Sequence, residues 1–191
     1  VKPREVIERI AANDPELVKV ELSANPTFQV KPAEYTRSLC EAMAGNTAVR
    51  ELRLARCDIR DDAAASIGEM LRTNHTLQVL DLEGNNIKSE GGIALARGLA
   101  DNSGLRTLNL LSQQQPFGEK VLTEFVKMFE TNATLLKLTW RVDSRQSFSL
   151  NRLLTRNNEI NRRIKADKDY TDFLPEALKN REDLQLVAYN A

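Results

Sequence analysis

Residues 77–87 read Leu-Gln-Val-Leu-Asp-Leu-Glu-Gly-Asn-Asn-Ile, and this stretch decides how the rest of the chain is interpreted. The same frame recurs 28 residues earlier and 28 residues later. The three copies carry apolar residues at matching places: Val49, Leu52 and Leu54; Leu77, Leu80 and Leu82; Leu105, Leu108 and Leu110. Self-similarity at a period of 20 to 50 residues indicates a repeat architecture, so the repeat is considered before any single element.

The spacing L-x-x-L-x-L-x-x-N-x-I is typical of a leucine-rich repeat, in which the apolar residues belong to a short strand. The frame extends outward at intervals of 32 and 30 residues. The outer copies are Leu17, Val20 and Leu22 on one side, and Leu135, Leu138 and Trp140 on the other. The sequence therefore predicts five strands.

Each of the first four strands is followed by apolar residues at helical spacing. These residues are Leu39, Ala42 and Met43; Ala65, Ile67, Met70 and Leu71; Ile93, Leu95, Ala96 and Leu99; Leu122, Phe125, Val126 and Phe129. Because a helix is wider than the spacing between strands, the stack bends with its strands inside. We predict an α/β fold: a right-handed leucine-rich-repeat solenoid, ribonuclease-inhibitor-like, with five parallel strands, outer helices and helical caps.

Two sets of polar residues recur with the repeat. Asn46, Asn74, Asn102 and Asn132 end the helices, where we expect the left-handed backbone that asparagine tolerates. The position after each strand is occupied by Asn25, Cys57, Asn85 and Gln113. We expect these side chains to point inward and to satisfy backbone groups of the turn.

Repeat arrays need ends that shield the last apolar layer. An N-terminal helix that starts near Pro3 has Val6, Ile7 and Ile10 on one face. A second helix, from about Ser147 to Ala166, should cover the fifth strand with Phe148, Leu150, Leu153, Leu154 and Ile160. We predict a repeat domain over residues 1–166 and a C-terminal extension over 167–191, with a short helix from Leu174 to Asn180.

Composition excludes several function classes. The 27 basic and 27 acidic residues cancel, which argues against nucleic acid or a membrane as partner. No apolar run is long enough for a membrane span or resembles a signal peptide, so we expect a cytoplasmic protein. We also expect the protein to be a monomer. Cys40 and Cys57 are interpreted as buried structural thiols, and the lone His75 has no catalytic partner. We expect no enzyme activity, metal or cofactor.

Several stretches resemble the leucine-rich domain of tropomodulins, proteins that cap the pointed end of actin filaments. Residues 9–22, Arg-Ile-Ala-Ala-Asn-Asp-Pro-Glu-Leu-Val-Lys-Val-Glu-Leu, resemble its beginning. Residues 113–118, Gln-Gln-Gln-Pro-Phe-Gly, are similar to its Gln-x-Gln-Pro-Leu-Gly turn, and residues 132–138 to its Leu-Leu-Lys approach to the last strand. Residues 156–163 resemble its basic terminal helix. The similarity spans about residues 5–165, with Thr139 and Trp140 replacing the family's Gly-Tyr.

The resemblance implies the family's second actin-binding region, which is independent of tropomyosin, and a location on the cytoskeleton. Tropomodulins bind tropomyosin through segments ahead of the repeats, so tropomyosin binding is expected to be absent here. Lys137 is carried over as an actin contact from the Leu-Leu-Lys motif. The other candidate contacts are inferred from exposure and charge: Arg56, Gln113, Gln114, Gln115, Arg141, Arg162 and Arg163. For Gln113, the inward structural role competes with binding.

A second class of function stays open. Long leucine-rich repeats also form nuclease inhibitors and activators of small GTPases, and the fold itself does not exclude those roles. Only the family resemblance favours actin over another protein partner.

Overall fold

A computed structural model of the chain describes all residues, 1–191, and shows one five-stranded parallel sheet in the order β1-β2-β3-β4-β5. The strands are Lys19–Glu21, Glu51–Arg53, Val79–Asp81, Thr107–Asn109 and Lys137–Thr139. In the sheet register, Leu80 of β3 lies between Leu52 and Leu108. This pairing confirms the repeat frame and the predicted fold class.

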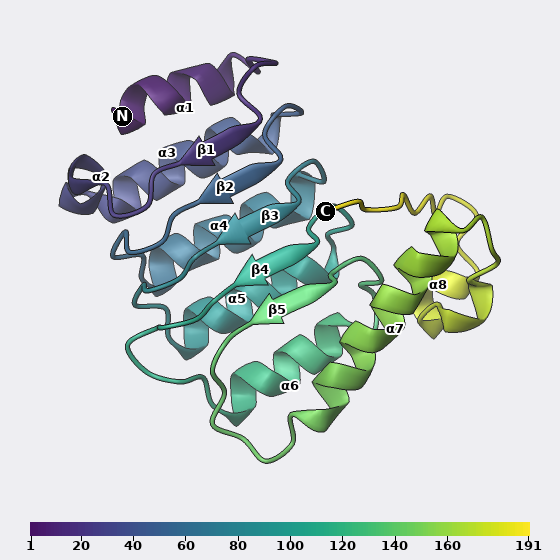
Figure 1. Cartoon of the computed structure of the whole chain (residues 1–191). Coiled ribbons are helices and arrows are strands. Elements are labelled where there is room, and N and C mark those ends of the chain that lie inside the picture. Colours follow the sequence, from purple (N-terminus) through teal and green to yellow (C-terminus); the bar gives the residue numbers. More distant parts are fainter.

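Four helices cover the opposite wall (Figure 1): α3 (Pro32–Ala44), α4 (Asp61–Thr73), α5 (Ser89–Ala100) and α6 (Glu119–Met128). Their apolar faces and the inward strand residues form one core. The prediction for α4 was wrong at Ala65, which is exposed, whereas Ala63 and Ala64 are buried. A short helix that was not predicted, α2 (Pro26–Val30), begins where the Asn25 side chain accepts a hydrogen bond from the Phe28 amide.

A ladder of buried asparagines ties each repeat to the one before it. The Asn102 amide nitrogen donates to the carbonyls of Leu71 (2.7 Å) and Asn74 (2.8 Å) in the preceding repeat. Its side-chain oxygen accepts from the backbone amides of Gly104 and Leu105 in its own turn. Asn74 and Asn132 repeat this arrangement, and Asn46 differs only in donating to one carbonyl, that of Ile10. The expected left-handed backbone was wrong, because none of the four has a positive φ; these positions need an amide that donates and accepts together.

Four of the seven left-handed residues lie instead two positions after the last inward leucine of the first four strands: Ala24, Arg56, Gly84 and Ser112, with φ between 51° and 68°. One residue further on, the expected inward role is confirmed. Asn85 accepts from the amides of Cys57 and Ile59, and Gln113 donates to the Leu82 carbonyl at 2.9 Å. The turn after each strand is therefore held from inside the array.

Both predicted caps are present. Helix α1 (Pro3–Ala11) buries Ile10 beside the first repeat, and α7 (Phe148–Lys165) closes the other end. Phe148 was wrongly assigned to the covering face, since its side chain is 81% exposed. Beyond α7 lie a 3-10 turn, η1 (Thr171–Phe173), and α8 (Glu176–Lys179), which corresponds to the predicted short helix. None of the helices has both the length and the apolar composition that crossing a membrane requires.

Replacing one ladder asparagine should destabilise the whole array. Asn102→Ala leaves two buried carbonyls and two buried amides without partners, so we expect a loss of about 3 to 5 kcal/mol in the free energy of unfolding. Urea unfolding followed by circular dichroism measures this loss. The exposed Asn180 is the control, because Asn180→Ala should change the free energy by less than about 0.5 kcal/mol. A loss below about 1 kcal/mol for Asn102→Ala would contradict the ladder.

Glycine at an exposed left-handed position should stabilise the chain. A side chain at Ala24, with φ 51°, raises the backbone energy there by about 1 to 2 kcal/mol, more than the chain entropy that glycine adds. We expect Ala24→Gly to raise the free energy of unfolding by about 0.5 to 1 kcal/mol. Thermal and urea unfolding check this value. In the matched control Ala65→Gly, an exposed position within α4, the sign should reverse.

Candidate protein-binding surface

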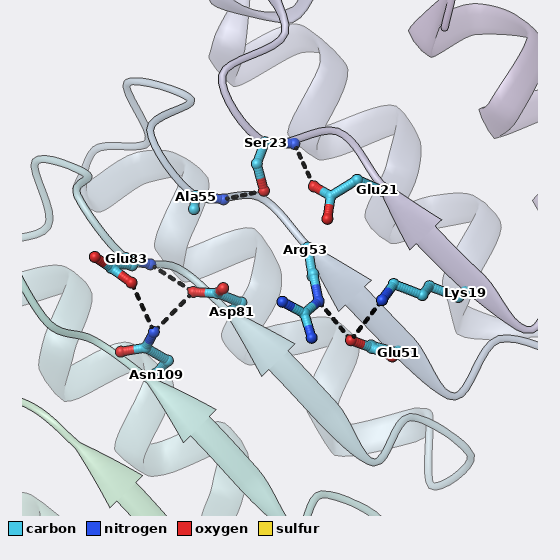
Figure 2. A network of polar contacts seen from close by, with 9 residues as sticks. All are labelled: Lys19, Glu21, Ser23, Glu51, Arg53, Ala55, Asp81, Glu83 and Asn109. Atoms are coloured by element: carbon cyan, nitrogen blue, oxygen red, sulfur yellow. Dashed lines mark hydrogen bonds and ion pairs between the residues drawn. The ribbon is translucent and has the colours of Figure 1, made fainter.

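The outward side chains of the first strands are paired with one another (Figure 2). Glu51 on β2 accepts from Arg53 at 2.5 Å and forms an ion pair with Lys19 on the neighbouring strand at 3.3 Å. On the next two strands the Asn109 amide donates to both Asp81 and Glu83, each at 3.1 Å. The charges and polar groups of this part of the sheet are therefore satisfied within the molecule.

The last strand differs, because its cations have no such partner. Lys137 and Arg141 are exposed, and neither takes part in an ion pair. Residues 137–165 hold eight basic and two acidic residues, a net charge of +6 in a chain whose total is zero. We call the exposed cations of this segment the basic end: Lys137, Arg141, Arg145, Arg152, Arg162 and Lys165.

The turn formed by residues 113–118 is hydrogen-bonded to the residues that follow β5. The Phe117 amide donates to the Arg141 carbonyl at 3.0 Å, and the Asp143 amide donates to the Phe117 carbonyl at 2.8 Å. Gln114 and Gln115, just before this junction, are exposed. The structure thus brings these two glutamines close to Arg141, as one group at the carboxyl ends of the last strands.

Gln113 faces the other way. Its amide nitrogen donates to Leu82, and its side-chain oxygen accepts from the Ile87 amide at 3.0 Å. Arg56 belongs to the same loop edge but to the second repeat. Its backbone is held by Glu83 and Gln29, while its side chain is exposed and without an acidic partner. The Arg56 guanidinium is therefore available to a partner, whereas the Gln113 side-chain amide is already hydrogen-bonded within the protein.

The two arginines at the end of α7 form a separate group. Helix α7 extends toward the edge of the sheet where the strands begin. There Asn158 donates to the carbonyl of Leu136, the residue just before β5, at 2.9 Å. Arg162 and Arg163 both donate to Glu159, at 2.6 and 2.7 Å. These hydrogen bonds lower the pKa of Glu159 to about 2. Lys137, at the start of β5, directly follows Leu136, whose carbonyl accepts from Asn158.

Arg145 was missed as a candidate, and Arg152 was interpreted only as one of the basic residues of the terminal helix and was not included among the candidate contacts. Both are exposed and unpaired, and both lie within the basic end. No single motif marks them. Counting charge over 137–165, rather than over the whole neutral chain, would have found them.

The site holds no catalytic arrangement. No three His, Cys, Asp or Glu side chains are grouped closely enough to bind a metal ion. Burial raises the pKa of the Cys40 thiol to about 12 and that of Cys57 to about 11, so both thiols stay protonated and unreactive at neutral pH. A cavity of about 750 Å³ lies between α1, α2 and α3, away from the basic end. The basic end is an open surface, which suits a macromolecule better than a small molecule.

The comparisons with known proteins agree with this architecture. Residues 1–160 match the family model described as TMOD/LMOD Leucine-rich domain. Human tropomodulin-4 is 32% identical over 162 residues, which are 84% of this chain and 46% of that protein. Human leiomodin-2 is 32% identical over 159 residues, 83% of this chain and 28% of that protein. The chain thus spans less than half the length of these relatives.

Two solved structures are similar. The structure described as leiomodin-1 actin-binding site 2 has a TM-score of 0.77 and 30% identity, over 85% of this chain and 93% of that chain. The Caenorhabditis elegans tropomodulin C-terminal domain has a TM-score of 0.79 and 24% identity, over 88% of this chain and all of that one. The second likeness is one of fold.

The Glu159 pairing predicts a pH dependence. Because the pKa of Glu159 is lowered in the folded chain, its contribution to stability is present above its ordinary value of 4.5 and is lost as the pH falls toward 2. We expect the stability difference between the wild type and Glu159→Gln to shrink over this range. Urea unfolding at several pH values measures it. A difference that stays constant over this range would contradict the pairing of Glu159 with the two arginines.

Proposed function

The chain belongs to the tropomodulin and leiomodin family, and from this membership we propose that it binds actin and caps the pointed end of actin filaments. The resemblance seen in the sequence is confirmed, since the family match covers residues 1–160. The family consists of actin regulators that are not enzymes, which confirms the prediction of a non-enzymatic protein. Actin as partner is supported by the likeness to the leiomodin-1 structure described as actin-binding site 2.

One observation of this chain supports the proposal: the last strand of the solenoid and the residues after it carry exposed positive charges that form no ion pair. The exposed Lys137 and Arg141 leave their charge available, whereas Lys19 and Arg53 share Glu51. A basic surface on a neutral protein steers an acidic protein surface toward one end of the molecule. A filament end that presents acidic side chains would meet this end first.

The mechanism that we propose is steric. The turns of the array are fixed from inside by Asn85 and Gln113, so little ordering entropy is lost when the surface docks. A rigid solenoid that sits on the last subunits then occupies the space of the next one. Capping in this form needs tight binding and bulk, and no chemical step.

Within this proposal the candidate residues have different roles. Arg56, Gln114, Gln115, Lys137, Arg141 and Arg162 are exposed and form the contact surface. Gln113 supports the loop from inside, and Arg163 is held by its neighbours on α7 and beyond. We propose no contact with tropomyosin for this chain.

Pointed-end elongation with barbed ends blocked is the decisive measurement, together with co-sedimentation with filaments. Saturating protein should stop pointed-end growth, and added tropomyosin should not alter the effect. If the protein neither slows growth nor binds filaments, the actin proposal is wrong. Slower growth only through a complex with free monomers would favour sequestration. Stimulated GTP hydrolysis by a small GTPase, or inhibition of a nuclease, would favour the alternative class.

Charge reversal at the last strand should weaken capping. Lys137→Glu and Arg141→Glu each replace an attraction by a repulsion at the basic end, and we expect each to raise the apparent Kd for pointed ends about tenfold, equivalent to about 1.4 kcal/mol. Elongation assays at several salt concentrations measure the change, and the wild type should lose affinity as salt increases.

The matched control is Arg37→Glu. Arg37 is also exposed and free of ion pairs, but it lies on α3 near the other end of the array. Equal weakening by Arg37→Glu and Lys137→Glu would show a general charge effect and contradict a localised surface. Thermal unfolding of each variant verifies that the fold is retained.

A further inference from the structure

The segment after α7 runs back along the edge where the strands begin, so that the C-terminus lies near the starts of β3 and β4 (Figure 1, yellow). It lies beyond residue 160, where the family match ends. Leu174 and Leu178 are buried with Ala133 and Ile160 in a small separate cluster, and Leu184 and Leu186 pack against it. We call residues 167–191 the strap. It is thus an additional layer on a domain that has its own core and caps.

The last part of the strap is held through its backbone. The Asn161 amide donates to the Tyr189 carbonyl at 3.2 Å, and the Tyr189 amide donates back to Asn161 at 2.8 Å. Arg106, which precedes β4, donates to the Val187 carbonyl at 2.9 Å. The Val187 side chain points away and is 69% exposed. Few side-chain contacts therefore secure residues 187–191.

Arg106 is covered by the strap without a compensating charge. It is 7% exposed, donates only to the carbonyls of Thr134 and Val187, and its Nε atom has no partner. Burial lowers the pKa of its guanidinium. A buried cation without an acidic partner opposes the covered state, because water would solvate it better. The strap thus closes over a group that favours its opening.

The strap also contacts Arg163, one of the candidate binding residues. The Arg163 guanidinium donates to the Asp169 carbonyl at 2.9 Å and lies over the Phe173 ring at 4.4 Å. Asp169 and Phe173 both belong to the strap. Glu159 accepts from Nε, the Asp169 carbonyl accepts from Nη1, and Phe173 covers one face of the guanidinium. Arg163 therefore contributes less to the basic end while the strap is closed.

We propose that the strap is an autoinhibitory cover, and that its release frees Arg163 and Arg106 and strengthens binding to an acidic partner. This inference rests on the proposed function, in which the partner is an actin filament. Segments with few buried contacts open with small free energies, so residues 187–191 should open most readily, whereas the part of the strap around Leu174 and Leu178 opens only when its small apolar cluster is disrupted. Affinity is then set by the balance between closed and open strap.

The test uses the full chain with the strap expelled by charge. The release variant carries Leu178→Asp and Leu186→Asp, which place carboxylates where apolar side chains pack. The control carries Ala177→Asp and Val187→Asp, the same added charge at the adjacent, exposed positions. Hydrogen exchange of residues 184–190 reports release without any actin. We expect at least tenfold faster exchange in the release variant, and unchanged exchange in β2 and β3.

Filament binding then measures the consequence. The release variant should bind about three- to tenfold more tightly than the wild type, and the control should match the wild type. Adding Arg163→Gln to the release variant should remove a large part of the gain and leave the part that Arg106 supplies, which a purely structural role of the strap would not predict. If the release variant does not fold, Phe173→Ala provides a milder release with the same expected direction.

The outcomes separate the two proposals. Faster exchange with unchanged or weaker binding overturns the autoinhibitory role and leaves the proposed function standing. Exchange in the wild-type strap as slow as in β3 also overturns it, because the segment would then be a fixed part of the domain. Failure of every variant and of the wild type to bind filaments overturns the proposed function instead, while exchange still reports whether the strap opens.

Discussion

The structure depends on one interaction, the buried asparagine amide that each repeat shares with its predecessor. At Asn102, two carbonyls of one repeat and two amides of the next are paired by this one side chain, and Asn74 contacts two carbonyls and two amides in the same way. Unpaired backbone groups at this depth would cost more than most single contacts contribute. The ladder therefore fixes the distance and the orientation between repeats, and the strand register and the core follow from it.

The same requirement positions the candidate site. After Asn132 there is no further repeat, so the carbonyls at the end of the ladder need partners from another element. Asn157 on α7 donates to the carbonyls of Asn132 and Leu135, and Arg156 donates to those of Phe129 and Asn132. These four hydrogen bonds fix α7 across the end of the array. The cations on the outer side of α7 and those of β5 then form one basic end.

Much of the fold could be predicted from the sequence, because each copy of the repeat shows the same spacing of strand residues and so indicates the same register. The strand positions, both caps and the inward role of Gln113 followed from local spacing. Features that depend on contacts across repeats did not. The backbone atoms of Gly68 and Gly98 approach so closely that a Cβ on Gly98 would lie 2.1 Å from the Gly68 carbonyl oxygen, whereas helix propensity counts both glycines as costs. The sequence predicted Arg163 to be an exposed charge. In the structure Phe173 covers its guanidinium, a contact that the residues next to Arg163 in the sequence do not indicate.

The position of the site follows from how a repeat array ends. An outward charge on an inner strand has a neighbouring strand on each side, and a pairing partner can be placed there, as Glu51 pairs with Lys19 and Asp81 with Asn109. Lys137 has a neighbouring strand on one side only, and the residue opposite it on β4 is the neutral Thr107. Its charge is left to solvent or to a partner. A solenoid of zero net charge thus acquires a charged end because the pairing along its sheet stops where the repeats stop, and binding at that end uses an asymmetry that the repeat itself cannot supply.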